Sequence, residues 1–153
     1  MATTGNAPAG RNVDSISYYA HVAGGVPGVT PTGLIEGAIA CNPLDGSIDP
    51  NQAMLPAGAA AKGVLGVITD AWPGGVPEGK PCSARYLGVV GINIAANTAV
   101  AFGDKLIVAN AQGDAKPRTN ETDCDIVAVA LESIDAQPAR GRVMARLQLA
   151  YQP

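Results

Sequence analysis

The sequence predicts an all-β protein, a small β-sandwich or barrel of short antiparallel strands with an extended N-terminal arm. Residues that interrupt regular structure are abundant, because 19 Gly and 12 Pro occur among the 153 residues. Apolar runs are short and are separated by turn residues at intervals of about ten to twenty residues, which is typical of small sandwiches and barrels. Aromatic residues make up only 4% of the chain. The core must therefore be built from Val, Ile, Leu and Ala.

The first 33 residues predict an arm and a linker. Residues 1–12 are small and polar, and they carry too little apolar surface to offset the entropy of ordering. Residues 15–22 alternate between polar and apolar side chains, with the period of two expected of a half-buried strand. Residues 24–33 are rich in Gly and Pro and predict a long turn. We therefore expect residues 1–33 to form an arm that carries one adhesive strand, and residues 34–153 to form the β-rich body.

Six apolar runs predict the strands of the body. Glycines at positions 88 and 91 interrupt the longest run and predict a bulge or bend there, because Gly inside a strand otherwise only costs stability. Residues 51–62 are the one segment with some helical character, which Pro56 and Gly58 make doubtful. The predicted strands cover residues 34–40, 64–69, 85–95, 106–109, 126–131 and 143–149.

Charge and composition argue against nucleic-acid and membrane partners. The formal charge is −3, and the ten Lys and Arg residues are scattered without forming a basic stripe. The longest weakly polar stretch, residues 86–102, is broken by Gly and Asn, unlike the roughly 20 apolar residues of a membrane-spanning helix. The N-terminus lacks the pattern of a signal peptide. Three widely spaced cysteines fit neither paired disulfides nor a zinc site, so we expect reduced thiols in a cytoplasmic chain.

Catalytic and cofactor motifs are missing from the sequence. Nucleophilic hydrolysis usually needs a His base, and His21, the single His, lies beside the Gly/Pro linker. Two Gly-x-x-Gly runs lack the Lys-Ser/Thr of a phosphate-binding loop. Three alternating carboxylates, Glu121, Asp123 and Asp125, predict a solvated turn, with a Ca²⁺ site as the alternative. We expect no enzyme activity, cofactor or metal, although paired carboxylates from distant strands remain a possible hydrolase or lyase site.

Surface adhesion is the function that remains. Trp72 lies in a loop stiffened by Pro and Gly, where it can anchor a partner or cover the end of its own barrel. Tyr18 and Tyr19 point to opposite faces of the predicted strand, so one can pack inward while the other meets a partner. Two nearby arginines can meet an acidic partner or line a solvated hairpin end. The candidate partner-binding residues are Ile16, Tyr18, Tyr19, His21, Trp72, Arg140 and Arg142.

From about residue 33 to residue 149, the order of these blocks resembles the capsid decoration, or cement, proteins of tailed bacteriophages. The shared pattern is an Asp-Gly turn, a strand with a central Gly-Val, a second Gly-Val strand, a Gly-Asp-apolar strand, an apolar strand ending in Ala-Leu-Glu and a final Val-x-apolar strand. The loop at residues 72–75 and the linker at 24–33 depart from this pattern. The matching segments are residues 45–46, 64–68, 86–90, 103–106, 126–132 and 143–147.

The resemblance implies a non-catalytic virion protein, made in the host cytoplasm, that binds the outer surface of an icosahedral head and strengthens it. Its implied partners are the major capsid protein and copies of itself in a homotrimer. We expect the arm to bind by adding a strand to a neighbouring sheet, repeated over many equivalent sites. Two alternatives remain open: a small virion module that binds a receptor or glycan, and a β-barrel hydrolase or lyase that uses carboxylates.

Overall fold

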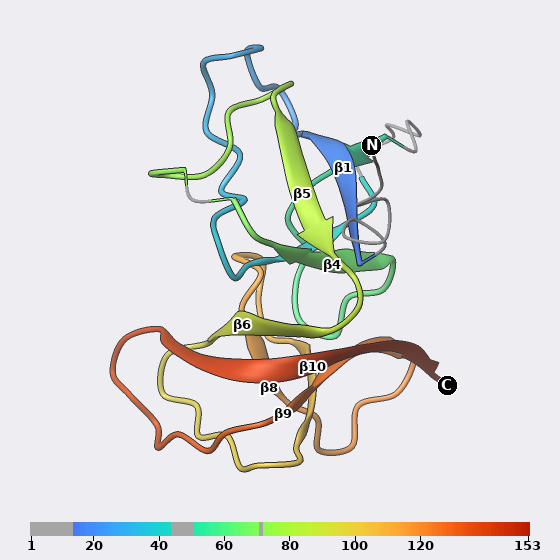
Figure 1. Ribbon diagram of the computed structural model, residues 1–153, viewed down its shortest axis with the longest axis vertical. Coiled ribbons are helices and arrows are strands. Elements are labelled where there is room, and N and C mark those ends of the chain that lie inside the picture. The colour runs from blue at the N-terminus through green and yellow to red at the C-terminus, as the bar shows by residue number, and fades with distance from the viewer. Residues whose placement is uncertain (1–13, 44–50, 71) are drawn as a thin grey trace, which may run out of the picture.

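A computed structural model describes residues 14–43, 51–70 and 72–153, and it is all-β, as predicted. The strands form a five-stranded sheet of order β2-β4-β5-β1-β3 and a closed barrel of order β10-β6-β8-β7-β9. Figure 1 shows the two units stacked along the long axis of the molecule, with the barrel at the C-terminal end of the chain. No helix in the described ranges is both long and apolar enough to cross a membrane.

The first sheet curls until its two end strands almost meet. Its central strand β1 runs antiparallel to β5 and parallel to β3. Residues Cys41 and Met54 then join the two ends of the sheet, because each donates its amide to the other's carbonyl, at 2.8 and 3.0 Å. The strands are β1 (Ser15–Ala20), β2 (Ile39–Cys41), β3 (Gln52–Ala53), β4 (Val64–Ile68) and β5 (Pro81–Arg85).

The structure corrects the expectation that residues 15–20 form an adhesive strand on an arm. Strand β1 is paired along both edges, and Ala20 is fully buried in the core of the first sheet. The alternation of side chains indicates a strand and its two faces, but it carries no information on which distant segment pairs with that strand. In this chain the partner β5 lies more than sixty residues away, from Ser15 paired with Arg85 to Tyr19 paired with Pro81. Residues 1–12 of the expected arm lie outside the described residues.

The barrel contains the larger apolar core. Strand β10 pairs with β6 through its first half and with β9 through its second half, which closes the barrel. Along β10, Val143, Ala145 and Leu147 are buried and alternate with exposed residues, as the sequence pattern predicts. The strands are β6 (Val89–Ile94), β7 (Lys105–Val108), β8 (Ala115–Pro117), β9 (Cys124–Ala130) and β10 (Gly141–Gln152).

The predicted strands differ from the observed ones mainly in the first sheet. The runs at 64–69, 106–109, 126–131 and 143–149 coincide closely with β4, β7, β9 and β10. The run at 85–95 is divided, because Gly88 has a φ of +90° in the turn between β5 and β6, where the sequence predicts a bend. The run at 34–40 forms a strand only at its end, as β2. Residues 51–62 hold β3 and turns, with no helix.

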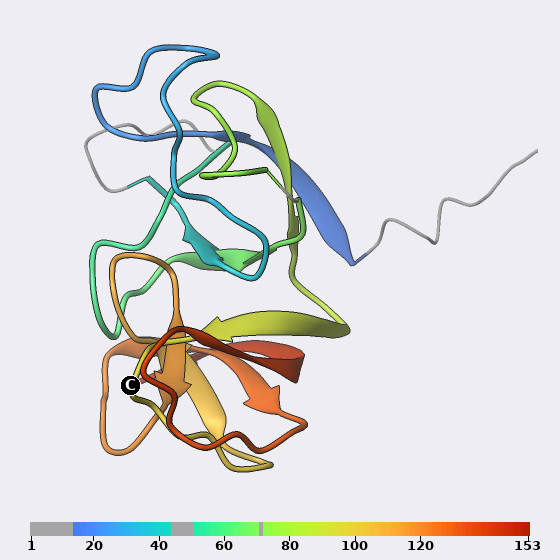
Figure 2. The ribbon, with the colours of Figure 1, turned by 90° about the vertical axis from the view of Figure 1, so that its left-hand side faces the viewer.

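The two units pack through the segment before and within β2. Asn93 of β6 donates its amide nitrogen Nδ2 to the Glu36 carbonyl at 3.0 Å, and its backbone N–H to the Gly37 carbonyl at 3.0 Å. The Ile39 amide donates to the Gly113 carbonyl of the barrel at 2.8 Å. Ile39 and Val67 belong to the core of the barrel although they lie on strands of the first sheet. Figure 2 shows this junction edge-on, with β2 and β4 above the barrel.

Candidate interaction surface

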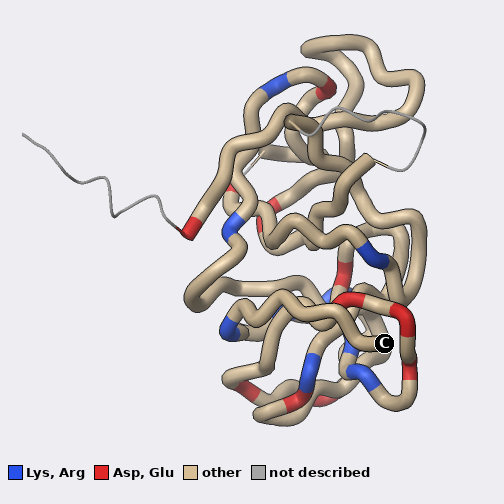
Figure 3. Tube along the Cα trace, turned by 90° about the vertical axis from the view of Figure 1, so that its right-hand side faces the viewer, with Lys and Arg blue, Asp and Glu red and all other residues tan. Residues whose placement is uncertain are grey.

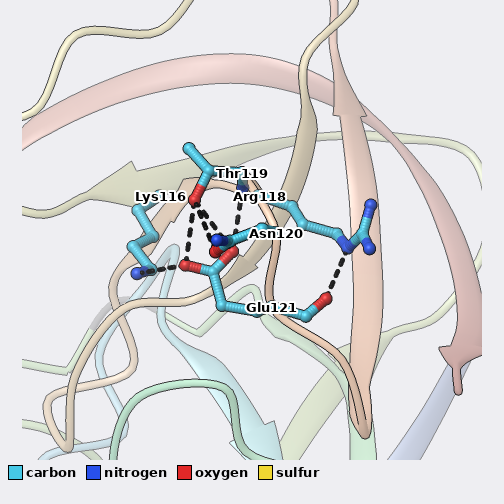
Figure 4. Close-up of polar contacts among 5 residues, drawn as sticks. All are labelled: Lys116, Arg118, Thr119, Asn120 and Glu121. Carbon is cyan, nitrogen blue, oxygen red and sulfur yellow. Dashed lines mark hydrogen bonds and ion pairs between the residues drawn. The ribbon is translucent and has the colours of Figure 1, made fainter.

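The carboxylate cluster at 121–125 is bound by its own chain. Figure 4 shows the Glu121 carboxylate accepting from the Lys116 ammonium at 2.9 Å and from the Thr119 amide at 2.8 Å. The Arg118 Nε donates to the Glu121 carbonyl at 2.7 Å. The hydrogen bond from Lys116, followed by that from the Thr119 amide, lowers the pKa of Glu121 to about 2. These contacts stabilise the hairpin loop between β8 and β9.

The other two carboxylates of the cluster point to different partners. Asp123 accepts from the Lys62 ammonium at 3.1 Å and from the Tyr151 hydroxyl. Asp125 accepts the Val64 amide at 2.9 Å and so ties β9 to β4. Across the described ranges, no group of three or more His, Cys, Asp or Glu side chains is arranged to hold a metal ion. The geometry of this cluster therefore favours the structural interpretation made from the sequence over the Ca²⁺ alternative.

The three cysteines are unpaired and buried. Burial raises the pKa of both the Cys41 and the Cys82 thiol to about 12. Because the thiolate is the nucleophilic form of cysteine, both thiols are chemically inert near neutral pH.

His21 lies in an ion pair beneath the loops at the far end of the first sheet. Its Nδ1 is 3.2 Å from Oε2 of Glu78, a residue that is only 8% exposed. The other carboxylate oxygen of Glu78 accepts the Val22 amide at 2.6 Å. The backbone of Glu78 continues the attachment, because its amide donates to the Thr30 carbonyl and its carbonyl accepts from the Gly28 amide. His21 and Glu78 therefore secure the loop that follows β1.

We define the loop tip as residues 22–31 and 72–79, two loops that lie against each other. Their backbones meet at Pro31 and Pro77, and four prolines restrict the backbone of the two segments. The loop tip exposes large apolar side chains, with Val29 71%, Val26 55% and Trp72 44% accessible to solvent. Its single charged residue is the nearly buried Glu78. The loop tip is thus a stiff, apolar and almost uncharged surface.

Charge is distributed unequally between the two units. Described residues 14–85 carry seven charged side chains, whereas residues 86–153 carry thirteen. Figure 3 shows the charged positions gathered around the barrel and sparse toward the loop tip. An uncharged apolar surface at one end of an otherwise charged molecule is typical of a contact site for another macromolecule.

The structure places the seven candidate residues in separate regions. Trp72 lies in the loop tip, where it is half exposed, which leaves open both roles expected for it. On β1, Tyr19 and Ile16 are exposed, whereas Tyr18 packs against the core of the first sheet, and burial raises the pKa of its hydroxyl. One tyrosine thus points inward and its neighbour outward, as the alternation indicates.

The two arginines face carboxylates of their own chain. The Arg140 Nε lies 2.6 Å from Oδ1 of the buried Asp114, and the Arg142 Nη2 lies 3.5 Å from Oε2 of Glu36. Sequence reasoning missed Val26 and Val29, because a Gly/Pro-rich segment was interpreted as a linker. The available signal was two isolated Val residues inside a loop whose backbone is restricted by Pro.

Neither a protein-family model nor a curated protein matches this sequence. Among solved structures, the chain is similar to the head fiber gp8.5 N base in bacteriophage phi29. The two share a TM-score of 0.52 at 14% sequence identity, over 88% of this chain and 92% of that one. The similarity shows a common fold that includes both units of the molecule.

Proposed function

We propose that this chain is a structural virion protein of a tailed bacteriophage that binds the outer surface of the head and strengthens it. The observation that carries the proposal is the fold shared with a phage head fiber base over nearly the full length of both chains. The apolar loop tip supports it, because it supplies a preformed contact surface at one end of the molecule. The order of sequence blocks that resembles the decoration proteins points to the same class.

Binding through the loop tip needs little rearrangement. The backbone is held by the contacts of Glu78 and by prolines, so docking Val29 and Trp72 costs little conformational entropy. Apolar side chains with few charges around them are also desolvated cheaply. A single contact of this size is weak, but repetition over the equivalent positions of a capsid lattice multiplies the effective affinity. The major capsid protein is the proposed partner.

Strand addition by residues 15–20 does not fit this proposal. Both edges of β1 are occupied, so these residues would have to leave the first sheet before pairing with another chain. The loop tip takes over the adhesive role that the sequence analysis assigned to this strand. The homotrimer implied by the family resemblance stays a prediction.

The chain acts by adhesion rather than catalysis in this proposal. The clustered carboxylates are engaged by Lys116, Lys62 and the Val64 amide, and the two most perturbed thiols are held in the protonated form. Groups committed to their own fold in this way make poor general acids or nucleophiles.

Co-sedimentation tests the proposal directly. The full chain is mixed with mature heads of the phage that encodes it, and the bound fraction is measured after pelleting. We expect saturable binding that falls at least tenfold with Val29→Asp. The matched control is Leu87→Asp, which places the same charge at an exposed leucine in the turn between β5 and β6 and should bind normally. Absence of wild-type binding would overturn the function, whereas equal binding by both variants would remove the loop tip from it.

A fibre-type module that binds host glycans is the second candidate, because the similar structure is part of a head fiber. Screening the full chain against immobilised bacterial surface glycans separates the two candidates. Glycan binding that is lost in Trp72→Ala, without binding to heads, would favour this second function.

A further inference from the structure

Phe102 is the most exposed aromatic residue of the described structure, with 71% of it accessible to solvent. It lies in the loop between β6 and β7. Figures 1 and 2 show this loop at the end of the barrel that faces away from the first sheet, opposite the loop tip. A large apolar side chain in this position has no role in the core or in the proposed contact with the head.

The loop that carries Phe102 is held rigidly. The Phe102 amide donates to the Ser133 hydroxyl at 2.8 Å, and the Gly103 amide donates to the Ala130 carbonyl at 2.8 Å. Residues Val100 and Ile134 exchange two backbone hydrogen bonds of 2.9 Å each. Gly103 has a φ of +89°, so the sharp turn after Phe102 uses the residue that tolerates this backbone. The side chain is therefore presented outward as a fixed knob.

A hollow lies directly beside the knob. Its volume is about 530 Å³, and it is lined by the loop itself and by residues 133–135. The lining includes apolar Val100 and Ile134 together with the carboxylates of Asp104 and Asp135, whereas Phe102 does not line it. A cavity of about 150 Å³ is enough to hold benzene, so this hollow is large enough for a phenyl ring. The positive edge of such a ring also suits carboxylates at the rim.

We propose that the partner of this surface is a second copy of the same chain, and that each copy inserts Phe102 into the hollow of the other. A knob and a hollow built from one loop make the surface self-complementary, which is the requirement of a contact around a two-fold axis. A ring of three copies would instead need the knob and the hollow on two different faces. The pairing leaves the loop tip of each copy at the far end of the molecule, free to bind elsewhere.

Mass measurement in solution tests the pairing without any capsid. Analytical ultracentrifugation of the full chain should show a dimer at high micromolar concentration, and Phe102→Asp should weaken dimerisation at least tenfold. Ala99→Trp, which fills the hollow from an exposed lining position, should weaken it as well while leaving the knob intact. The control Val29→Asp should dimerise like the wild type. Circular dichroism verifies that each variant is folded.

Mixing the two dimerisation variants sharpens the test. Phe102→Asp retains a normal hollow and Ala99→Trp retains a normal knob, so a mixture regains one of the two contacts. The mixture should therefore associate more strongly than either variant alone. A wild-type monomer at all concentrations, a trimer, an unaffected Phe102→Asp variant, or a mixture with no gain would each overturn the proposal.

Discussion

The two units of this molecule are both curled sheets, but they are stabilised differently. The barrel core holds fifteen buried residues, most of them Val, Ile or Leu, whereas the core of the first sheet holds eight, of which four are Ala. The first sheet compensates with hydrogen bonds between its loops and with the buried carboxylate of Glu78. Apolar packing therefore dominates one unit, and loop pairing dominates the other. The difference teaches that the unit with the thinner core is the one whose loops are built into a surface.

Removing one buried isoleucine from each unit gives the largest effect. Ile92 in the barrel and Ile68 in the first sheet are both fully buried. Replacing Ile92 by Ala should lower the free energy of unfolding by about 3–4 kcal/mol, and Ile68→Ala by about 2–3 kcal/mol, because fewer large neighbours surround the second cavity. Urea unfolding followed by far-ultraviolet circular dichroism measures both. Fluorescence of Trp72, the single tryptophan, reports on the first sheet. Equal losses would remove the contrast between the two cores.

Glu78→Gln tests whether loop pairing depends on one carboxylate. The amide oxygen can still accept the Val22 amide, but the ion pair with His21 is lost, so we expect a destabilisation of about 1–2 kcal/mol. Hydrogen exchange should become faster at residues 22–31 and stay unchanged in the barrel. Glu132→Gln, at an exposed carboxylate that accepts the Met144 amide in the barrel, is the matched control. Uniformly faster exchange in both units would show that Glu78 supports the whole fold and not only the loop tip.

The smallest effect concerns the pH dependence of the barrel. The folded pKa of Glu121 is about 2, below its ordinary value of 4.5, so the charged carboxylate stabilises the fold above pH 4.5. That contribution is lost as the pH falls from about 4.5 toward 2. Because the pair with Lys116 is screened by solvent, we expect Glu121→Gln to cost about 1 kcal/mol or less at pH 7. The difference from wild type should disappear near pH 2. A constant difference across this range would assign the effect to packing instead of charge.

The predictions from sequence were best in the barrel, for a physical reason. Runs such as 126–131 and 143–149 are long enough for their alternation or continuous apolar character to stand out, and they become β9 and β10. Strands β3, β5 and β8 were missed because they are short or contain Pro, Ser or Lys, so their strand character arises from pairing with neighbours.

The candidate surface was predicted only in part. Trp72 was identified from its stiff loop, and it does lie in the loop tip. The exposure of Val29 and Phe102 was not predicted, since a single apolar residue between turn residues gives no periodic signal. Arg140 and Arg142 were correctly seen as a positive group, but their pairing with Asp114 and Glu36 depends on segments distant in sequence.

The sequence by itself determined the class of the fold, because frequent Gly and Pro prevent long helices and the short apolar runs favour strands. It also determined which face of β1 and β10 is buried, since side-chain alternation is a local property of the backbone. Only the tertiary structure decided that β1 lies inside a sheet, that the carboxylates bind their own chain, and that Val29 and Phe102 remain exposed at opposite ends. These outcomes depend on contacts between residues far apart in the chain, and local patterns carry no record of such contacts.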